Sequence, residues 1–451
     1  MKKLFGTDGI RGLANDLLTP ELALRLGMCG AYVLTNEVHK PKIIVASDTR
    51  KSKDMLACAL IAGICSVGGD VLFAGVLPTP ALPHLTREYK ADAAVMISAS
   101  HNPMQDNGIK WFNNLGDKLS DEIEAEIEKL MASDHPFIRP IGEDIGRVIE
   151  VKRAQADYVD FLCSTCNYDL SGMKIVLDCA NGAASFVAPE VFRRLNAEVF
   201  VHCNQPDGCN INKSCGSTCT ESLQGFVAEQ GADVGFAFDG DADRVIACDE
   251  HGNIVDGDKI MGLCAISLNK KNMLAKNTLV CTVMTNIGLK RKLKELGVNT
   301  IETSVGDRYV LEEMRSGGYN LGGEQSGHII FSDYNTTGDG ILSAIQVLNV
   351  MKAENIQLSE LSEEIPIFPQ ILLNVEVGAN SKKAAMQDIE VNKRIEQVKN
   401  ELGDDGRILV RESGTEPLIR IMIEGINDDI ILQKALFVAE PLIESHCGKI
   451  R

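Results

Sequence analysis

Three reactive side chains share one short segment, residues 97–110: a hydroxyl, an imidazole and an amine, from Ser100, His101 and Lys110. The segment follows an apolar run, residues 93–97, that predicts a buried strand. The hydroxyl is therefore expected on a turn at a strand end, where open α/β sheets bind ligands. Side chains of these types suit nucleophilic or phosphoryl chemistry. The alternative is a polar surface loop with an incidental Ser-His pair.

A second segment carries three carboxylates at alternate positions, Asp239, Asp241 and Asp243, directly after the apolar run 234–238. Like charges this close repel each other, so a cation must offset them. A hard divalent cation such as Mg²⁺ takes oxygen ligands, and three aspartates leave room on it for a phosphate oxygen. Arg244 could then bind the same phosphate as a fork. The alternative is a solvated acidic turn.

Glycines bracket polar side chains in a third segment, residues 322–328, which contains Glu324 and Ser326. Such a loop can approach a ligand closely and offer partners to sugar hydroxyls. Glycine-rich turns are common, so this signal is weak alone. Two further weak signals are Arg11, in a glycine-rich N-terminal stretch, and the helix-like start at Asp307 and Arg308.

A fourth segment, residues 411–420, predicts a phosphate clamp. It contains Arg411, Ser413, Gly414, Thr415 and Arg420. Hydroxyls, guanidinium groups and backbone N–H groups around a glycine all donate to phosphate oxygens. The alternative is a hairpin turn with surface arginines.

Strands and helices that alternate along the chain must position these segments. Strands are expected at residues 42–47, 70–76, 93–97, 174–178, 233–238, 278–282 and 299–303, and helices at 52–65, 121–131, 189–195 and 289–296. The alternation predicts βαβ units and mostly parallel sheets. The C-terminal part predicts a smaller α+β unit, with strands at 371–377, 407–410 and 418–424 and one charged helix over 382–402. Prolines and acidic residues at 363–369 indicate the linker.

The composition excludes several classes of protein. The chain has 451 residues, of which 45% are hydrophobic and 24% charged, and its net charge is −18. That is a globular composition with length for about three or four domains. Non-specific binding to nucleic acid or to an anionic membrane is not expected of so acidic a chain, and a phosphorylated substrate needs a local basic pocket. No apolar core follows the two N-terminal lysines, and the most apolar window, residues 55–69, is too short to span a bilayer, so we expect a cytoplasmic protein.

The chain has 14 cysteines. Without a secretory signal they are expected to be free thiols. Four of them, Cys203, Cys209, Cys215 and Cys219, gather in one polar loop. Their gaps are irregular and lack a pair of C-x-x-C knuckles, so a zinc site is only weakly indicated.

Together, the four segments resemble the α-D-phosphohexomutase superfamily, and within it the branch that acts on glucosamine phosphates. The matching stretches follow the expected order and cover nearly the whole chain: residues 5–12, 98–110, 239–244, 323–328 and 411–420. Gln325 and Gly414 favour the glucosamine branch over the phosphomannomutase/phosphoglucomutase branch, which tends to carry Met and Asn there. Ser47-Asp48-Thr49-Arg50 departs slightly from the Gly-Arg-Asp-x-Arg of the superfamily, which puts only fine packing in doubt.

The resemblance implies an α/β fold of four domains around a central cleft. Three are related α/β domains with mixed sheets, and the smaller C-terminal domain is α+β. We place them at residues 1–155, with the phosphoserine loop, 156–256, with the metal loop, 257–368, with the sugar loop, and 369–451, with the phosphate clamp.

The resemblance also implies a role for each loop. Ser100 would carry a phosphoryl group as phosphoserine, and one Mg²⁺ per active site would be held by Ser100, Asp239, Asp241 and Asp243. Arg244 would contact the phosphoserine, and Lys110 and Arg11 would lie beside the reacting group. The sugar would be bound by Glu324, Ser326, Asp307 and Arg308, and its phosphate by Arg411, Ser413, Gly414, Thr415 and Arg420.

The implied reaction interconverts glucosamine 6-phosphate and glucosamine 1-phosphate, feeding amino-sugar nucleotide and cell-wall precursor synthesis. Phosphoserine gives its phosphoryl group to the sugar, and a bisphosphorylated sugar, which is also the activator, turns over before Ser100 takes back the other group. Such transfer depends on positioning and charge stabilisation. We expect Lys110 to act in general acid/base catalysis with a pKa lowered by nearby cations, and His101 to make a structural hydrogen bond. A clamp that accepts both orientations favours a separate, mobile domain.

Two alternatives stay open: a mutase for glucose or mannose phosphates, and a non-catalytic sugar-phosphate sensor. A sensor needs neither a nucleophile nor a metal, so Ser100, the acidic triad and Lys110 argue against it. A phosphatase with an aspartate nucleophile is disfavoured by the separate serine loop. The expected partner is a small sugar phosphate. The sequence does not show the source of the first phosphoryl group, and it leaves open whether the chain forms a homodimer.

Overall fold

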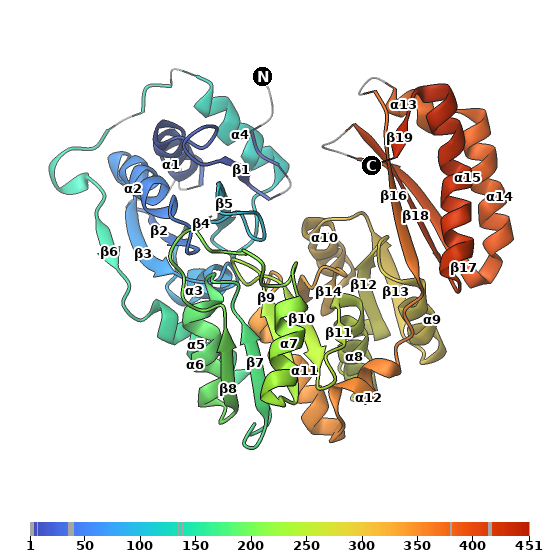
Figure 1. Ribbon diagram of the computed structural model, residues 1–451. Coiled ribbons are helices and arrows are strands. Elements are labelled where there is room, and N and C mark those ends of the chain that lie inside the picture. Colours follow the sequence, from blue (N-terminus) through green and yellow to red (C-terminus); the bar gives the residue numbers. More distant parts are fainter. Residues whose placement is uncertain are drawn as a thin grey trace. The chain divides into compact units, whose positions relative to one another are not determined.

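The computed structural model (Figure 1) describes residues 4–6, 8–34, 40–133, 135–137, 139–378, 381–413 and 417–450. The chain divides into two compact units. The first contains residues 1–284 and 296–364, and the second contains residues 285–295 and 365–451. The boundary after Glu364 falls in the predicted linker.

Three sheets form the first unit. The first has the order β1-β5-β4-β2-β3-β6, the second β11-β10-β9-β7-β8 and the third β13-β12-β14-β15. Their strands are β1 (Ile10–Leu13), β2 (Lys42–Ser47), β3 (Asp70–Val76), β4 (Ala93–Ile97), β5 (Asp106–Asn113), β6 (Val148–Glu150), β7 (Lys174–Asp178), β8 (Glu198–His202), β9 (Val234–Phe238), β10 (Val245–Asp249), β11 (Ile254–Val255), β12 (Thr278–Thr282), β13 (Asn299–Thr303), β14 (Leu321–Gly323) and β15 (Ile329–Phe331).

Helices cover these sheets, as Figure 1 shows. In the first unit they are α1 (Pro20–Leu34), α2 (Lys53–Ser66), α3 (Ala81–Glu88), α4 (Asp121–Met131), α5 (Ala154–Ser164), α6 (Ala184–Arg194), α7 (Glu221–Gln230), α8 (Gly257–Lys270), α10 (Asp307–Gly317), α11 (Gly340–Glu354) and α12 (Leu358–Glu363), with short 3₁₀ turns at Gly142–Asp144 and Ala275–Asn277. Burial of Ile43, Val45 and Leu60 gives the first sheet and its helices a shared core. Among the described residues, no helix is both long and apolar enough to cross a membrane.

Each of these sheets combines parallel strands with an antiparallel hairpin. In the first sheet, β2, β3 and β4 are parallel, and β5 pairs antiparallel with β4. In the second sheet, β7 and β9 are parallel, and β10 pairs antiparallel with β9. In the third sheet, β12 and β14 are parallel, and β15 pairs antiparallel with β14. The sheets are therefore mixed. The segments identified in the sequence around Ser100, Asp241 and Glu324 are the three hairpin connections β4–β5, β9–β10 and β14–β15. Equivalent loops of three related sheets thus carry the reactive residues.

The second unit is a four-stranded antiparallel sheet in the order β17-β18-β16-β19. Its strands are β16 (Gln370–Glu376), β17 (Gly406–Glu412), β18 (Leu418–Gly425) and β19 (Lys449–Ile450), and its helices are α9 (Ile287–Glu295), α13 (Lys382–Met386), α14 (Ile389–Leu402) and α15 (Asp428–His446), with a 3₁₀ turn at Gly403–Asp405. Helices α14 and α15 pack beside each other, and buried Ile421, Val398 and Val438 form the core. The fourth segment identified in the sequence, residues 411–420, belongs to this unit and again connects two antiparallel strands, β17 and β18.

One predicted helix, over residues 382–402, is wrong, because the chain forms two helices there. Asp388 interrupts them with extended backbone angles. Its carboxylate accepts hydrogen bonds from the backbone N–H groups of Glu390 and Val391. An aspartate that binds the first free N–H groups of a helix defines a new helix start, although the charge pattern continues across it.

Candidate active site

Ser100 lies on the turn that links β4 to β5, with its side chain almost fully buried. Its backbone is left-handed, with φ +54°, which is uncommon for a serine and frequent at functional sites. The hydroxyl donates a 2.6 Å hydrogen bond to Asp239 Oδ2 on the β9–β10 loop and lies 3.3 Å from His101 Nδ1. Two segments 139 residues apart in sequence are therefore joined at this hydroxyl.

Arg50 holds the turn in place, a role that the sequence did not reveal. The side chain has no solvent exposure and donates to the Asp48 carboxylate at 2.9 Å. Its remaining N–H groups donate to four backbone carbonyls around the turn, those of Ser100, Asn102, Pro103 and Asp106. Asp48 also accepts a hydrogen bond from Ser98, whose hydroxyl accepts from the Ser100 N–H. One buried ion pair thus fixes the backbone that presents the Ser100 hydroxyl.

The three carboxylates of Asp239, Asp241 and Asp243 gather on the β9–β10 loop, as predicted. All three are buried, and one oxygen from each lies within 4.8 Å of the others. Gly240 separates two of them and passes close to the serine turn, since a Cβ there would lie 2.5 Å from the Ser100 carbonyl oxygen. The spacing requires glycine at this position.

The electrostatics of the triad match a cation. Burial, followed by repulsion from Asp243 and Asp241, raises the pKa of Asp239 well above its ordinary value. Asp241 Oδ1 and Asp243 Oδ1 are buried and have no hydrogen-bond partner within the described part of the chain. Unpaired buried carboxylate oxygens are costly. Hard oxygen donors arranged in this way suit Mg²⁺, so the residues present fit the predicted ion.

Lys110 lies on β5, opposite Met96 of β4, and points into the same cluster. Its ammonium group donates to Asp241 at 2.9 Å and forms an ion pair with Asp8 at 3.0 Å. Burial alone would lower the pKa of Lys110, but attraction to Asp241 and Asp8 outweighs burial and raises the pKa. The expectation that nearby cations lower this pKa is wrong, because the attraction of Asp241 and Asp8 to the amine exceeds the repulsion from Arg11.

Two arginines and a histidine surround the carboxylates. Arg11, on β1, pairs with Asp8, and Arg244 Nε lies 3.9 Å from Asp243. Burial, together with repulsion from Arg244 and Arg11, lowers the pKa of His101 to about 4. The imidazole beside Ser100 is therefore neutral near pH 7.

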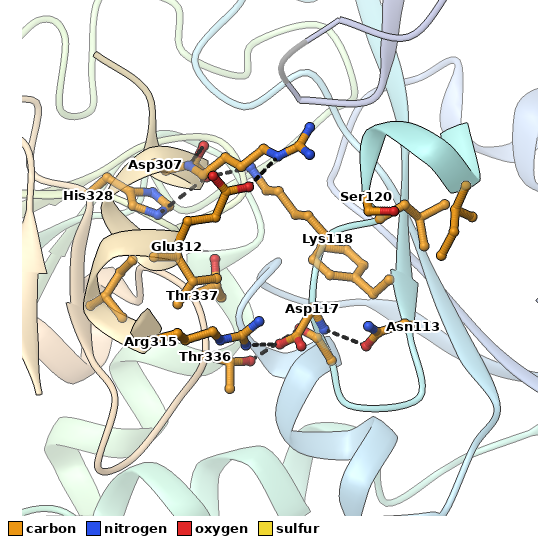
Figure 2. Close-up of a pocket in the computed structure, with 17 residues that line it drawn as sticks. Asn113, Asp117, Lys118, Ser120, Asp307, Glu312, Arg315, His328, Thr336 and Thr337 are labelled. Atoms are coloured by element: carbon orange, nitrogen blue, oxygen red, sulfur yellow. Dashed lines mark hydrogen bonds and ion pairs between the residues drawn. The ribbon is translucent and has the colours of Figure 1, made fainter. Parts of the chain in front are cut away.

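A chain of ion pairs extends from the cluster to the third sheet, and the sequence did not single it out. Lys118 pairs with both Asp8 and Asp307, and His328 lies 3.6 Å from Asp307 and 3.6 Å from Asp243. Figure 2 shows Lys118, Asp307 and His328 at a cavity of about 250 Å³ between the segment 112–123 and helix α10. The charged side chains of the first and third sheets are thereby linked directly.

The predicted sugar-binding residues occupy the third sheet and α10. Glu324 is half-buried and accepts a hydrogen bond from the Gly306 N–H at 3.0 Å, while Ser326 is exposed. Arg308 pairs with Asp121 and Glu312 on the rim of the cavity. Glu324 and Ser326 thus lie in the β14–β15 loop, and Arg308 lies at the start of α10, next to Asp307 of the ion-pair chain.

The second unit holds the predicted clamp. Arg411 of β17 and Arg420 of β18 are directly opposite each other in the antiparallel ladder. Burial, with repulsion from Arg420, lowers the pKa of Arg411. Like charges opposite each other destabilise a sheet unless an anion lies between them. Ser413 follows β17, whereas Gly414 and Thr415 fall outside the described residues.

Comparison with known proteins identifies all four parts of the chain. Models of the phosphoglucomutase/phosphomannomutase family match as alpha/beta/alpha domain I at residues 2–136, domain II at 156–252 and domain III at 256–368, and as the C-terminal domain at 372–440. A phosphoglucosamine mutase of Thermoanaerobacter sp. strain X514 is 54% identical over 98% of this chain and 99% of its own. A phosphoglucosamine mutase of Clostridium acetobutylicum is 52% identical over 98% and 99%.

Solved structures share the fold. A phosphoglucomutase/phosphomannomutase family protein from Burkholderia thailandensis superposes with a TM-score of 0.83 at 22% identity, over 99% of this chain and 98% of that one. The N-acetylphosphoglucosamine mutase of Aspergillus fumigatus, solved in complex with GlcNAc-6P and magnesium, gives 0.71 at 17% identity, over 98% and 96%.

Proposed function

Because the chain belongs to the phosphoglucosamine mutases of the phosphoglucomutase/phosphomannomutase family, we propose that Ser100 carries the phosphoryl group with which it interconverts glucosamine 6-phosphate and glucosamine 1-phosphate. The chain is an isomerase, since the reaction moves a phosphoryl group between two oxygens of one sugar. The observation that carries the proposal for Ser100 is its 2.6 Å hydrogen bond to Asp239, at the edge of a buried carboxylate triad.

Phosphorylation of Ser100 would place a dianion against three carboxylates, so the site requires a metal ion. Asp239, Asp241 and Asp243 would hold Mg²⁺ together with an oxygen of the phosphoserine. When bound, the ion supplies charge neutralisation for the transferring group. Asp241 Oδ1 and Asp243 Oδ1, which are buried and accept no hydrogen bond from any described residue, support this assignment.

The cationic side chains of the cluster would orient and stabilise the transferring phosphoryl group. Arg11 and Arg244 supply guanidinium groups, which bind phosphate oxygens as forks. Lys110, whose pKa is raised, stays protonated near neutral pH and would donate a proton or a hydrogen bond rather than accept one. Neutral His101 would keep the serine turn in shape through its contact with the hydroxyl.

The substrate would be held at both ends. Glu324 and Ser326, with Asp307 and Arg308, would bind sugar hydroxyls, and the opposed arginines Arg411 and Arg420, with Ser413, Gly414 and Thr415, would hold the phosphate that is not reacting. After the first transfer the bisphosphorylated sugar must present its other phosphate to Ser100. A clamp on a separately folded unit suits this step, since it must accept the sugar in two orientations.

Each of the four family domains carries one of the functional loops, and we assign the domains to residues 1–155, 156–256, 257–368 and 369–451. The bisphosphorylated sugar as activator, the cytoplasmic location and a homodimer stay predictions.

Turnover assays on glucosamine 6-phosphate, glucose 6-phosphate and mannose 6-phosphate test the proposal. We expect the highest kcat/KM with the amino sugar, and a higher value with either of the others would contradict the assignment. The Ser100→Ala variant should lose turnover but stay folded, with only a small decrease in melting temperature, since one buried hydrogen bond contributes about 1 kcal/mol. Ser164→Ala, at the exposed end of α5, is the matched control and should change neither.

A further inference from the structure

A second cluster of metal-ligating side chains lies in the second sheet, apart from the aspartate triad. It consists of Asp178, Cys203 and Cys215, whose carboxylate oxygen and two sulfurs lie within 4.8 Å of one another. Asp178 and Cys215 are buried, and Cys203 is half-buried. Within the described residues, this cluster and the triad are the two groups of at least three His, Cys, Asp or Glu side chains with such spacing.

The fold brings the three residues together from distant parts of the sequence. Asp178 ends β7, and Cys203 directly follows β8, its parallel neighbour, so both lie at the same edge of the sheet. Cys215 returns to that edge at the end of a long loop, where the Gly216 N–H donates to Asp178 Oδ2 at 2.8 Å. This hydrogen bond holds the end of the loop next to β7. The three ligands therefore come together only in the folded chain, and their sequence spacing gave a weak signal.

We propose that Asp178, Cys203 and Cys215 form a binding site for a thiophilic divalent cation of the zinc class. Two thiolates and a carboxylate are donors typical of tetrahedral zinc, whereas Mg²⁺ prefers oxygen alone. Zinc–ligand bonds of about 2.0–2.3 Å separate tetrahedral donors by roughly 3.3–3.8 Å, so side-chain shifts of roughly 1 Å would close the site. The fourth position is left to water.

This site has a direct connection to the serine turn. The loop between Cys203 and Cys215 carries Asn212, whose amide donates to the Ser100 carbonyl at 2.8 Å and to the Asn102 carbonyl at 3.1 Å. A metal ion that joins the two ends of this loop would restrict Asn212. The ion would therefore stabilise the support of the turn without touching the reacting atoms.

Cobalt(II) is a suitable probe, because thiolate ligands give it a charge-transfer absorption that oxygen ligands do not. The full-length protein would be freed of metal, kept reduced and saturated with Mg²⁺ to fill the triad. We expect one equivalent of Co²⁺ to produce the thiolate absorption, and Zn²⁺ to abolish it and to raise the melting temperature.

Cysteine variants assign the signal. Cys203→Ser and Cys215→Ser should lose both the absorption and the melting-temperature increase, whereas Cys209→Ser, in the same loop but outside the cluster, should keep both. If the buried Cys215→Ser variant fails to fold, the half-buried Cys203→Ser variant decides alone. The proposal is overturned if the wild type gives no thiolate absorption, or if the absorption survives in Cys203→Ser.

Discussion

Replacing Arg50 by lysine should damage both stability and turnover, although no atom of Arg50 belongs to a reacting group. The guanidinium group makes one hydrogen bond to Asp48 and four to carbonyls of the serine turn. A lysine keeps the charge but has a single nitrogen, so it cannot span these positions. Most of the carbonyls, and Asp48 in part, would then lose the guanidinium as a hydrogen-bond donor, and those of Ser100 and Asn102 would keep the Asn212 amide.

The size of the effect follows from burial. Breaking a buried ion pair costs about 3–5 kcal/mol, and this pair has no solvent exposure on either side chain. Displacing a reacting group by about 1 Å can cost roughly 100-fold in rate. We therefore expect Arg50→Lys to lower the free energy of unfolding by about 3 kcal/mol and kcat by roughly 100-fold, with KM for the sugar phosphate nearly unchanged, since the substrate contacts lie elsewhere.

Denaturant unfolding and steady-state kinetics on the same preparations measure both quantities. Arg194→Lys is the matched control, because Arg194 also has two acidic partners, Asp160 and Glu190, but lies at the surface. It should change neither quantity. Wild-type kcat in folded Arg50→Lys would refute the claim that this residue sets the position of Ser100.

Three further predictions concern the glycine contact, a buried acid and the metal. Gly240→Ala should reduce turnover at least tenfold, because its Cβ would lie 2.5 Å from the Ser100 carbonyl oxygen. The control Gly225→Ala places its Cβ in open space on α7 and should raise the melting temperature slightly without changing turnover. Equal activities of the two variants would contradict this prediction. Burial raises the pKa of Asp339 to about 6 from 3.8, so the folded state binds this proton more tightly, and roughly 2 kcal/mol of stability should be lost as pH rises from 4 to 7. Unfolding measured across that range should show less loss in Asp339→Asn. Mg²⁺ should raise the melting temperature of the wild type but not of Asp241→Asn, and a chelator should stop turnover; an equal increase in both proteins would contradict the triad assignment.

Strand positions could be predicted because buried apolar runs end abruptly at polar loops. The strands Ala93–Ile97 and Thr278–Thr282 have the bounds that the sequence predicted. The aspartate triad could also be predicted, since its three carboxylates are close together in the sequence. The helix break at Asp388 was missed, because a side chain that caps a helix start does not interrupt the pattern of charges around it.

Several interactions between distant segments were not predicted. The partners of Arg50 are mainly backbone carbonyls about 50 residues away, and a carbonyl has no signature in a sequence. The raised pKa of Lys110 depends on Asp8 and Asp241, which lie far from it in sequence and on either side of it. The cluster at Cys203 and Cys215 needs a long loop to return to its starting strand.

Transfer of a labelled phosphoryl group tests the central claim most directly. Enzyme carrying ³²P on a serine would be mapped by peptide mass spectrometry and mixed with unlabelled glucosamine 6-phosphate in a rapid-quench instrument. The account predicts that the label starts on Ser100 and appears within one turnover in the bisphosphorylated sugar, and then in glucosamine phosphate. Label that stays on the protein, or a phosphoserine at another position, would contradict it.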